Sequence, residues 1–409
     1  MTQRAALVVV LAGISAALHI GKLPPALPVL GDSLGVTLVQ AGFLLSLVQL
    51  AGMTLGLAMG AAADTLGPRR TMIAGLLVLS LASVLGAFAT TPQALLALRA
   101  LEGAGFLLAS LPAPGLIRRL VEPAGLSSML GLWGAYMPFG TAGALLAGPA
   151  FIVAFGWPAW WWLLGGLSFA MAIVLWAAVP AAADLRNAAA SGAGGAGVRI
   201  LRTVRSRGPW LASLAFAVYS AQWLAVIGFL PTIYAQAGLA TGYAAPATAL
   251  AAAVNMAGNI ASGRLLQRGV PAPVLLQVGY VAMATGAVVA FAPWGEAGTA
   301  QALLRYAGVL VFSSVGGLIP GTLFSLAVRV APDDGTVSTT VGWMQQWSSI
   351  GQFAGPPVAA WAAARAGGWH VTWWVTGACA LAGMAIAWGI SRFLAGHPQR
   401  AAAPAGRAS

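Results

Sequence analysis

Residues 156–165 read GWPAWWWLLG, and residues 368–377 read GWHVTWWVTG. The Gly-Trp pair, the later Trp-Trp pair and the closing Gly of the first stretch recur in the second at a constant offset of 212 residues. Tryptophan is a rare residue, so shared Trp positions are harder to obtain by chance than shared Ala or Leu positions. The match predicts that the two halves of the chain are related repeats.

Three further matches extend the repeat over most of the chain. Gly131 and Gly140 recur 211 residues later, GKLP at 21–24 recurs 207 residues later as GFLP, and Arg99 recurs 206 residues later as Arg305. Slowly drifting offsets in four places favour a real repeat over a coincidence of composition. Two parallel repeats of helices with a solute site between them are an architecture of membrane transporters.

The composition is that of a membrane protein. Hydrophobic residues make up 59% of the 409 residues and charged residues only 7%, whereas soluble domains contain about 25% charged residues. The formal charge of +12 does not favour a nucleic-acid partner, because the Arg residues lie in short clusters between apolar runs. Cys379 is the only cysteine, which excludes a disulfide framework and a cysteine metal cluster.

Apolar runs bounded by turn residues are long enough to cross a bilayer as helices, which need about 20 residues. Lipid offers no partner to an unpaired backbone group, so we expect helices rather than open strands. The sequence therefore predicts an all-α membrane protein with twelve transmembrane helices in two pseudo-symmetric six-helix bundles. The twelve runs are 6–29, 38–61, 71–90, 94–117, 127–151, 158–179, 209–236, 243–266, 272–292, 301–327, 337–361 and 371–394.

The basic residues predict that both termini are cytoplasmic, because connections rich in Lys and Arg stay inside. With the N-terminus inside, only Arg365 falls in an outer connection, and Lys22, Arg99 and Arg305 fall within spans or at their edges. The inner connections and tails then contain Arg4, Arg69, Arg70, Arg118, Arg119, Arg186, Arg199, Arg202, Arg205, Arg207, Arg264, Arg268, Arg329, Arg392, Arg400 and Arg407.

The longest connection divides the chain in the middle. Residues 180–208 are rich in Gly and Ala and then in Arg, a composition typical of a flexible charged linker. We therefore predict a first bundle at 1–180, a cytoplasmic linker at 181–208, and a second bundle with a short tail at 209–409.

Two motifs resemble those of the major facilitator superfamily. GAAADTLGPRR (60–70) is similar to the family's loop signature between its second and third helices, and LLALRALEGAG (95–105) is similar to its fourth-helix motif. With the repeat and the central linker, the resemblance covers residues 6–394. Within the superfamily, the sequence as a whole is similar to the cyanate and nitroimidazole permease-like branch. The fifth run has Ala135 and Ala144 where the family's antiporter motif has Gly.

The resemblance implies a gate at the cytoplasmic side. In the family, the acid and the arginines of the loop hold the two bundles together, which gives Asp64, Arg69 and Arg70 this role, with Arg118 as a candidate partner of Asp64. The alternative is a solvated loop that only sets the orientation of the chain.

The cations within the spans suggest an anionic solute. The resemblance implies that the first, fourth, seventh and tenth helices line the central cavity, which would place Lys22, Arg99 and Arg305 there. Arg grips oxyanions with paired hydrogen bonds, and Lys supplies a compact charge. Glu102 and His19 are the candidates for carrying a coupling proton.

Simpler interpretations of the same groups stay open. Lys22 can extend to the outer surface, Arg99 and Glu102 can neutralise each other on one helix face, Arg305 can anchor at the bilayer boundary, and His19 can be structural. Further polar residues are candidates for the cavity wall or, alternatively, for hydrogen bonds between helices. They are Tyr219, Gln222, Trp223, Asn255, Asn259, Trp343 and Gln346.

No catalytic constellation, metal-ligand spacing or phosphate-binding loop occurs, so we expect neither an enzyme nor a cofactor. We interpret the chain as a secondary transporter of the bacterial inner membrane, a monomer that takes up a small organic or inorganic anion with a proton by alternating access. A proton-driven drug or metabolite exporter and a non-transporting membrane sensor are the alternatives.

Overall fold

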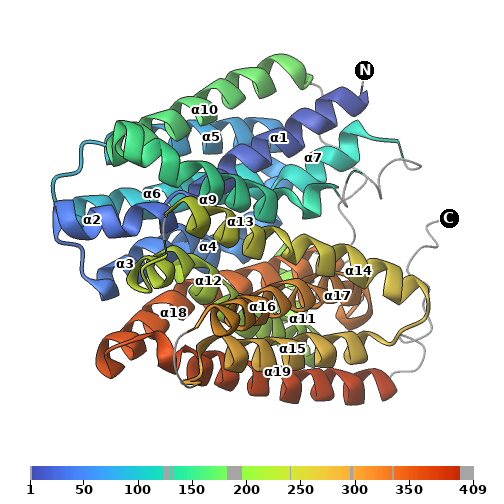
Figure 1. Ribbon diagram of the computed structural model, residues 1–409. Helices are drawn as coiled ribbons and strands as arrows, with labels where there is room; N and C mark the ends of the chain where they lie inside the picture. Colours follow the sequence, from blue (N-terminus) through green and yellow to red (C-terminus); the bar gives the residue numbers. More distant parts are fainter. Residues whose placement is uncertain are drawn as a thin grey trace.

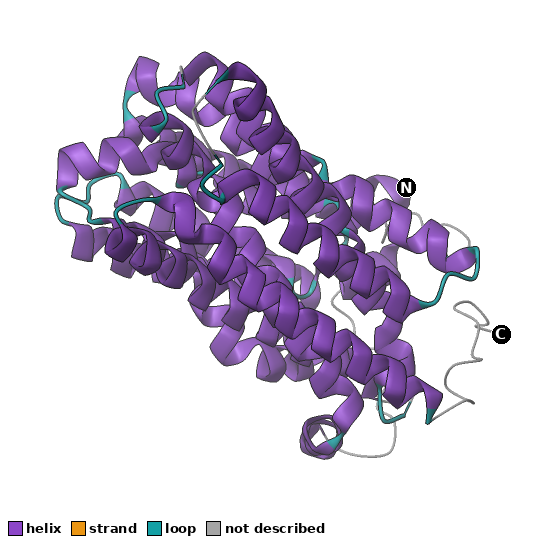
Figure 2. Ribbon diagram, turned by 60° about the horizontal axis from the view of Figure 1, so that its bottom comes forward, coloured by secondary structure: helices purple, strands orange, loops and turns teal. Residues whose placement is uncertain are grey.

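The computed structural model describes residues 2–122, 129, 132–181, 196–239, 241–294, 298–333 and 336–396. All regular elements in this part of the chain are helices (Figure 2). Ten of its helical segments are long and apolar enough to cross a membrane. The prediction of an all-α, multi-pass membrane protein is therefore confirmed, while the count of twelve spans and the cytoplasmic termini stay predictions.

The two predicted spans outside this set of ten are 243–266 and 337–361. The structure forms the first as two short helices, α13 (Thr241–Ala253) and α14 (Asn255–Gln267), which meet at Val254. It forms the second as one helix, α18 (Val337–Ala366), which contains Pro356 and Pro357.

The helices that precede the central connection pack on one another. α1 contacts α9 and α10, while α5 contacts α6 and α10. Their bounds are α1 (Thr2–Gly21), η1 (Pro24–Ala26), α2 (Leu27–Leu34), α3 (Leu38–Ser46), η2 (Leu47–Gln49), α4 (Leu50–Leu66), α5 (Pro68–Gly86), α6 (Pro92–Ser110), α7 (Ala113–Leu120), α9 (Tyr136–Phe155) and α10 (Trp157–Ala178).

The helices after the connection form a second group, below the first in Figure 1. α12 packs against α18 and α19, and α15 packs against α16 and α19. Besides α13, α14 and α18, this group contains α12 (Arg207–Gln236), α15 (Ala272–Phe291), α16 (Thr299–Gly316), α17 (Leu318–Val330), η6 (Trp369–Val371) and α19 (Thr372–Ala395).

Of the predicted linker, 182–195 lie outside the described residues. Residues 196–205 form a helix, α11 (Ala196–Arg205), which contacts α4 of the first group and α12 and α18 of the second. Arg202 on α11 forms an exposed ion pair of 3.3 Å with Asp333. The Arg-rich half of the connection is therefore helical where it is described.

Prolines break the first span close to its lysine. α1 ends at Gly21, and Pro24 and Pro25 begin the 3-10 turn η1, because proline has no N–H to donate and restricts the residue before it. The break leaves the carbonyl of Lys22 free to accept a hydrogen bond of 3.2 Å from Trp160 Nε1. The position of Lys22 is thus set by the end of α1 and by α10.

Glycines allow the closest contact in the first group. A Cβ on Gly75 of α5 would lie 2.4 Å from the backbone N of Ala109, and a Cβ on Gly105 of α6 would lie 2.7 Å from the backbone N of Leu79. Only glycine fits at both positions, so α5 and α6 pack backbone to backbone.

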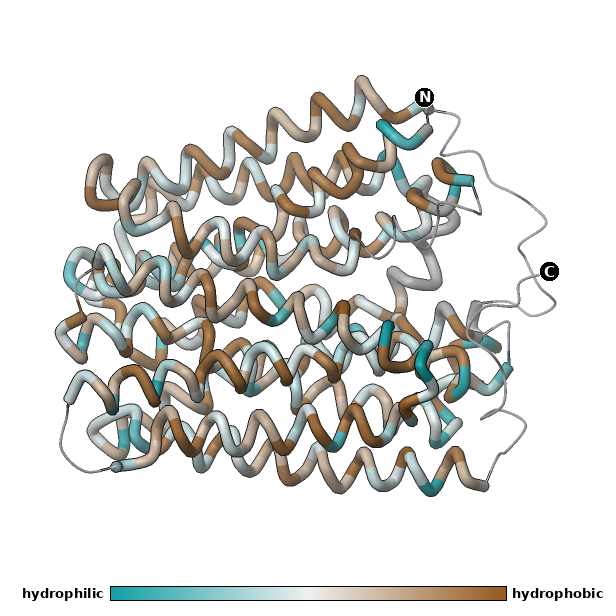
Figure 3. Tube along the Cα trace, turned by 45° about the vertical axis from the view of Figure 1, so that its right-hand side comes forward, coloured by the Kyte–Doolittle hydropathy of each residue, from teal (hydrophilic) through white to brown (hydrophobic). Residues whose placement is uncertain are grey.

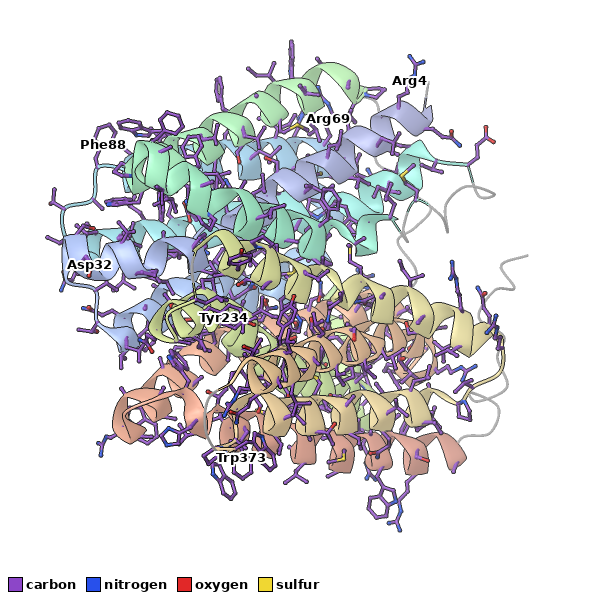
Figure 4. All side chains as sticks on the ribbon, viewed as in Figure 1. Arg4, Asp32, Arg69, Phe88, Tyr234 and Trp373 are labelled. Carbon is purple, nitrogen blue, oxygen red and sulfur yellow. The ribbon has the colours of Figure 1, made fainter. Side chains whose placement is uncertain are left out.

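Within the described residues, several helices of the first group pack against helices of the second. α3 and α4 pack against α18, α9 packs against α13, and η1 packs against α12. The start of α1 and the end of α19 lie at the same end of the molecule (Figure 1). In Figure 4 Arg4 lies near that end, while Asp32 and Phe88 lie at the other. Hydrophobic residues line the helices along their length (Figure 3).

Candidate functional site

Four of the predicted site residues meet inside the first group of helices. The ammonium of Lys22 contacts Glu102 Oε1 and donates to Ser83 Oγ at 3.0 Å. Arg99 Nη1 donates to Glu102 Oε2 at 2.6 Å, and His19 Nδ1 lies 3.7 Å from Glu102 Oε1. Glu102 is therefore the centre of a cluster that α1 and α6 bring together, named below the Glu102 cluster (His19, Lys22, Arg99 and Glu102).

Neighbouring helices hold the Glu102 cluster in place. Arg99 Nε donates to the carbonyl of Leu44 on α3 at 3.0 Å, and His19 Nε2 lies 2.8 Å from Ser168 Oγ on α10. The Lys22 ammonium also lies 4.6 Å from the centre of the Trp161 ring, at a distance suited to a cation–π interaction. Ser83, Ser168 and Trp161 are not predicted as site residues: single Ser residues are common in apolar spans, and Trp161 is interpreted from the sequence only as part of the repeat.

The Glu102 cluster is buried and has more positive than negative groups. His19 and Lys22 are 0% exposed, Arg99 3% and Glu102 2%. Two cations and one anion leave a formal charge of +1 with a neutral His19, and burying charge is costly unless it is balanced. Arg99 Nη2 and His19 Nδ1 are buried without a hydrogen-bond partner. The arrangement therefore has the capacity to accept an anion or to bind or release a proton.

A narrow crevice lies beside the cluster and is closed to solute in this conformation. The crevice leaves about 0 Å³ of space for a water molecule. It is lined by Leu23, Leu44, Leu95, Arg99, Glu102 and Trp161. From the sequence, the tips of Lys22 and Arg99 are predicted to lie in a central cavity shared by both bundles. The structure directs them toward Glu102, within the first group of helices.

Arg305 lies in the second group and makes different contacts. Its Nη1 donates to the carbonyl of Ala290 at 2.9 Å and its Nη2 to that of Ala292 at 3.1 Å. These carbonyls belong to the C-terminal end of α15, where a cation is favourable because the helix dipole is negative there. The repeat thus relates Arg99 and Arg305 in sequence, while their contacts differ.

Four of the predicted polar residues form a second buried cluster. Asn255 Nδ2 donates to Tyr219 Oη at 3.0 Å and to the carbonyl of Ser313 at 2.8 Å, and Asn259 Nδ2 donates to Asn255 Oδ1 at 3.0 Å. Trp223 Nε1 donates to Ser313 Oγ at 3.2 Å. The four residues are uncharged, and Asn255 and Trp223 both bond to Ser313, so the group ties α12, α14 and α16 together.

Gln346 connects the two groups of helices. Its side-chain amide donates to the carbonyl of Met53 and accepts from the backbone N–H of Leu57, both at 2.9 Å. Gln49 Nε2 donates to Gln352 Oε1 at 3.0 Å across the same contact of α4 and η2 with α18. Sequence analysis missed Gln49 and Gln352, although an amide within an apolar run is a signal of such pairing.

The remaining predicted polar residues lie on α12 and α18. Gln222 donates to the carbonyl of Val218 at 3.2 Å, and its Oε1 is buried without a partner. Trp343 packs edge-on against Trp210 and Trp347, with ring centroids 5.1 and 5.9 Å away, and its indole N–H is buried without a partner.

The predicted gate is described only in part. The side chains of Asp64 and Arg118 lie outside the described residues. Arg69 is 8% exposed and donates at 2.7 Å to the carbonyls of both Trp176 and Val179, at the end of α10 in its own group of helices. Arg70 is exposed. The gating role of these residues stays a prediction.

The fold is similar to that of solved transporters. A bacterial homologue of the human lysosomal transporter Spinster, in an inward-facing and occupied conformation, has a TM-score of 0.76 and 15% identity over 95% of this chain and 97% of that chain. The inward-facing, unoccupied form of such a homologue has a TM-score of 0.72 and 15% identity, over 96% and 97% of the two chains.

A D-xylose–proton symporter also matches, with a TM-score of 0.72 and 14% identity over 95% of this chain and 97% of that one. A comparison with curated protein sequences gave no match. The family model of the Major Facilitator Superfamily matches residues 5–356. Because this match spans most of the sequence and agrees with the fold, the chain belongs to the Major Facilitator Superfamily.

Proposed function

We propose that this protein takes up a small organic or inorganic anion together with a proton, by alternating access of two helical bundles. Membership of the superfamily makes it a multi-pass membrane transporter rather than an enzyme. The observation that carries the anion and proton assignment is the buried Glu102 cluster, with its formal charge of +1 and the partnerless Nη2 of Arg99.

The charges of the cluster give a physical route to coupling. A proton on Glu102 would raise the formal charge from +1 to +2 and release Lys22 and Arg99 from the carboxylate. A solute anion would then take the place of the carboxylate, because charge-assisted bonds to Arg and Lys are among the strong ones in a dry site. Binding of the anion and of the proton would each favour the other.

The path to the cluster would pass between the bundles. The carbonyl that holds Arg99 belongs to Leu44 on α3, and α3 packs against α18 of the second bundle. Separation of α3 and α18 would therefore expose α3, the helix whose carbonyl holds the guanidinium, to a solute between the bundles. Gln222, Trp343 and Gln346 on the second bundle, together with the Tyr219, Trp223, Asn255 and Asn259 cluster and Arg305, complete the proposed substrate-binding residues.

The remaining features of the proposal concern topology. We assign residues 1–180 and 209–409 to two bundles joined by a cytoplasmic linker at 181–208, with both termini in the cytoplasm of a bacterial cell and the protein a monomer in its inner membrane. Asp64, Arg69, Arg70 and Arg118 would lie at the inner side, where the family places its gate.

Uptake by purified protein in liposomes tests the proposal. Wild-type protein should accumulate one or more labelled anions from a panel of carboxylates and inorganic oxyanions, and an imposed inward proton gradient should raise the initial rate. Accumulation only of neutral or cationic solutes would refute the anion assignment, and outward transport driven by a proton gradient would indicate an exporter. Binding without counterflow would favour a sensor.

A further inference from the structure

An open hollow lies along α14, outside the Glu102 cluster. Its volume is about 480 Å³, within the range of about 300–1,000 Å³ found for small-molecule sites. The residues that line it recur at helical spacing along one face of α14. They are Ala257, Ile260, Ala261, Arg264, Leu265 and Arg268.

The hollow combines two cations with an apolar wall. Arg264 and Arg268 lie one helical turn apart, both are exposed, and no carboxylate in the described part of the chain pairs with either. Arg202, by contrast, pairs with Asp333. Ile260 beside them is 55% exposed. Two adjacent guanidinium groups favour a carboxylate or similar oxyanion, and the apolar wall favours a solute that has an apolar body.

The helix that forms the hollow follows directly on α13, a helix that contacts the first bundle. α13 packs against α9 of the first bundle. α14 continues from it toward the end of the molecule where α1 begins and α19 ends (Figure 1), and packs against α16 and α17 of its own bundle. The first bundle has Asp64 near the end of α4, whereas residues 263–269 around Arg264 and Arg268 contain no acid. The two arginines therefore have no acidic partner in their own segment and are available to bind an anionic solute.

We propose that the hollow along α14 is an entrance site, where Arg264 and Arg268 hold a small organic anion with an apolar body at the end of the molecule where α1 begins and α19 ends. The inference rests on the proposed function for the identity of the cargo, but the site itself can be tested by binding alone. The apolar wall of the hollow also indicates that the anion has an apolar body, a property on which the Glu102 cluster gives no information.

Binding of benzoate to purified protein in neutral-lipid nanodiscs tests the site. We expect the double variant Arg264→Gln/Arg268→Gln to raise the Kd about 3- to 10-fold, as two partly exposed charge pairs would. Arg365→Gln, which removes an exposed arginine outside the hollow, is the matched control and should leave the Kd unchanged. Sulfate, which has no apolar body, should bind the wild type more weakly than benzoate.

The outcomes separate this inference from the proposed function. If the wild type accumulates anions but the double variant binds benzoate as the wild type does, the entrance site is wrong and the transport proposal stands. If binding depends on the two arginines but no anion is accumulated, the transport proposal fails alone. If the wild type fails to bind benzoate, or if the arginines retain anionic lipid that benzoate does not displace, the entrance site is overturned.

Discussion

Neutralising Glu102 should destabilise the protein far more than removing Lys22, although both changes delete one buried charge. Glu102 balances Lys22 and Arg99, so Glu102→Gln leaves two buried cations without a counter-charge and raises the formal charge of the cluster from +1 to +2. Lys22→Met leaves the Arg99–Glu102 pair, with its hydrogen bond of 2.6 Å, and lowers the formal charge to zero.

The contacts set the size of the two effects. Removing one partner of a buried ion pair costs about 3–5 kcal/mol, whereas an apolar replacement that leaves no unpaired charge is often neutral. Lys22→Met loses its bond to Ser83, about 1 kcal/mol, and the Met side chain occupies a similar volume. We therefore expect Glu102→Gln to be less stable than Lys22→Met by about 2–4 kcal/mol.

Thermal unfolding in detergent, followed by Trp fluorescence, measures the difference. Mid-sized chains lose about 2–4 °C of Tm per kcal/mol and larger chains less, so we expect Glu102→Gln to lower Tm by about 5–10 °C and Lys22→Met by no more than about 2 °C. Glu122→Gln, at an exposed position, controls for the substitution itself. The argument that unbalanced buried charge sets the stability of the cluster would be refuted by a Glu102→Gln protein as stable as the wild type. It would also be refuted by a Lys22→Met protein less stable than Glu102→Gln.

Three further predictions concern transport and the contact between bundles. Lys22→Met and Arg99→Met should each abolish anion uptake in liposomes while the protein still inserts and folds; wild-type rates in both would remove the Glu102 cluster from the anion path. Glu102→Gln, assayed below its Tm, should retain anion exchange but lose the response to a proton gradient, and an unchanged response would place coupling elsewhere. Gln346→Leu should speed hydrogen exchange at the Leu57 amide about fivefold, the equivalent of about 1 kcal/mol for one lost hydrogen bond; unchanged exchange there would show that Gln346 does not protect α4.

The fold could be predicted because its determinants are periodic and local. Apolar runs predict helical spans, ten of which the structure contains among the described residues, while the relation of the halves indicated by the Gly-Trp and Trp-Trp repeat stays a prediction. The breaks within spans are harder to predict. Pro24 and Pro25 indicate one of them, but the break at Val254, which divides the predicted span 243–266 into α13 and α14, has no proline or glycine beside it.

Side-chain partners could be predicted only where they are close in sequence. Arg99 and Glu102 lie three residues apart on one helix, so the sequence alone already offers their pairing as one interpretation. The contact of Lys22 with Glu102 joins residues 80 positions apart, and the contact of Gln49 with Gln352 joins residues 303 positions apart. Such pairs depend on how helices rotate and pack, which periodicity in a single sequence does not specify.

The lone lysine of this chain is better explained by transport than by stability. An apolar side chain at position 22 would leave the Arg99–Glu102 pair neutral, so the ammonium adds a charge to a dry site that folding does not require. Intramembrane ionisable groups are costly and are typical of solute and proton paths. A cluster of two cations and one acid has two ways to become balanced, the arrival of an anion or the loss of a proton from one of its members. Both are exchanges with a solute or solvent, and we infer that the excess charge at Lys22 makes the cluster responsive to what enters between the bundles.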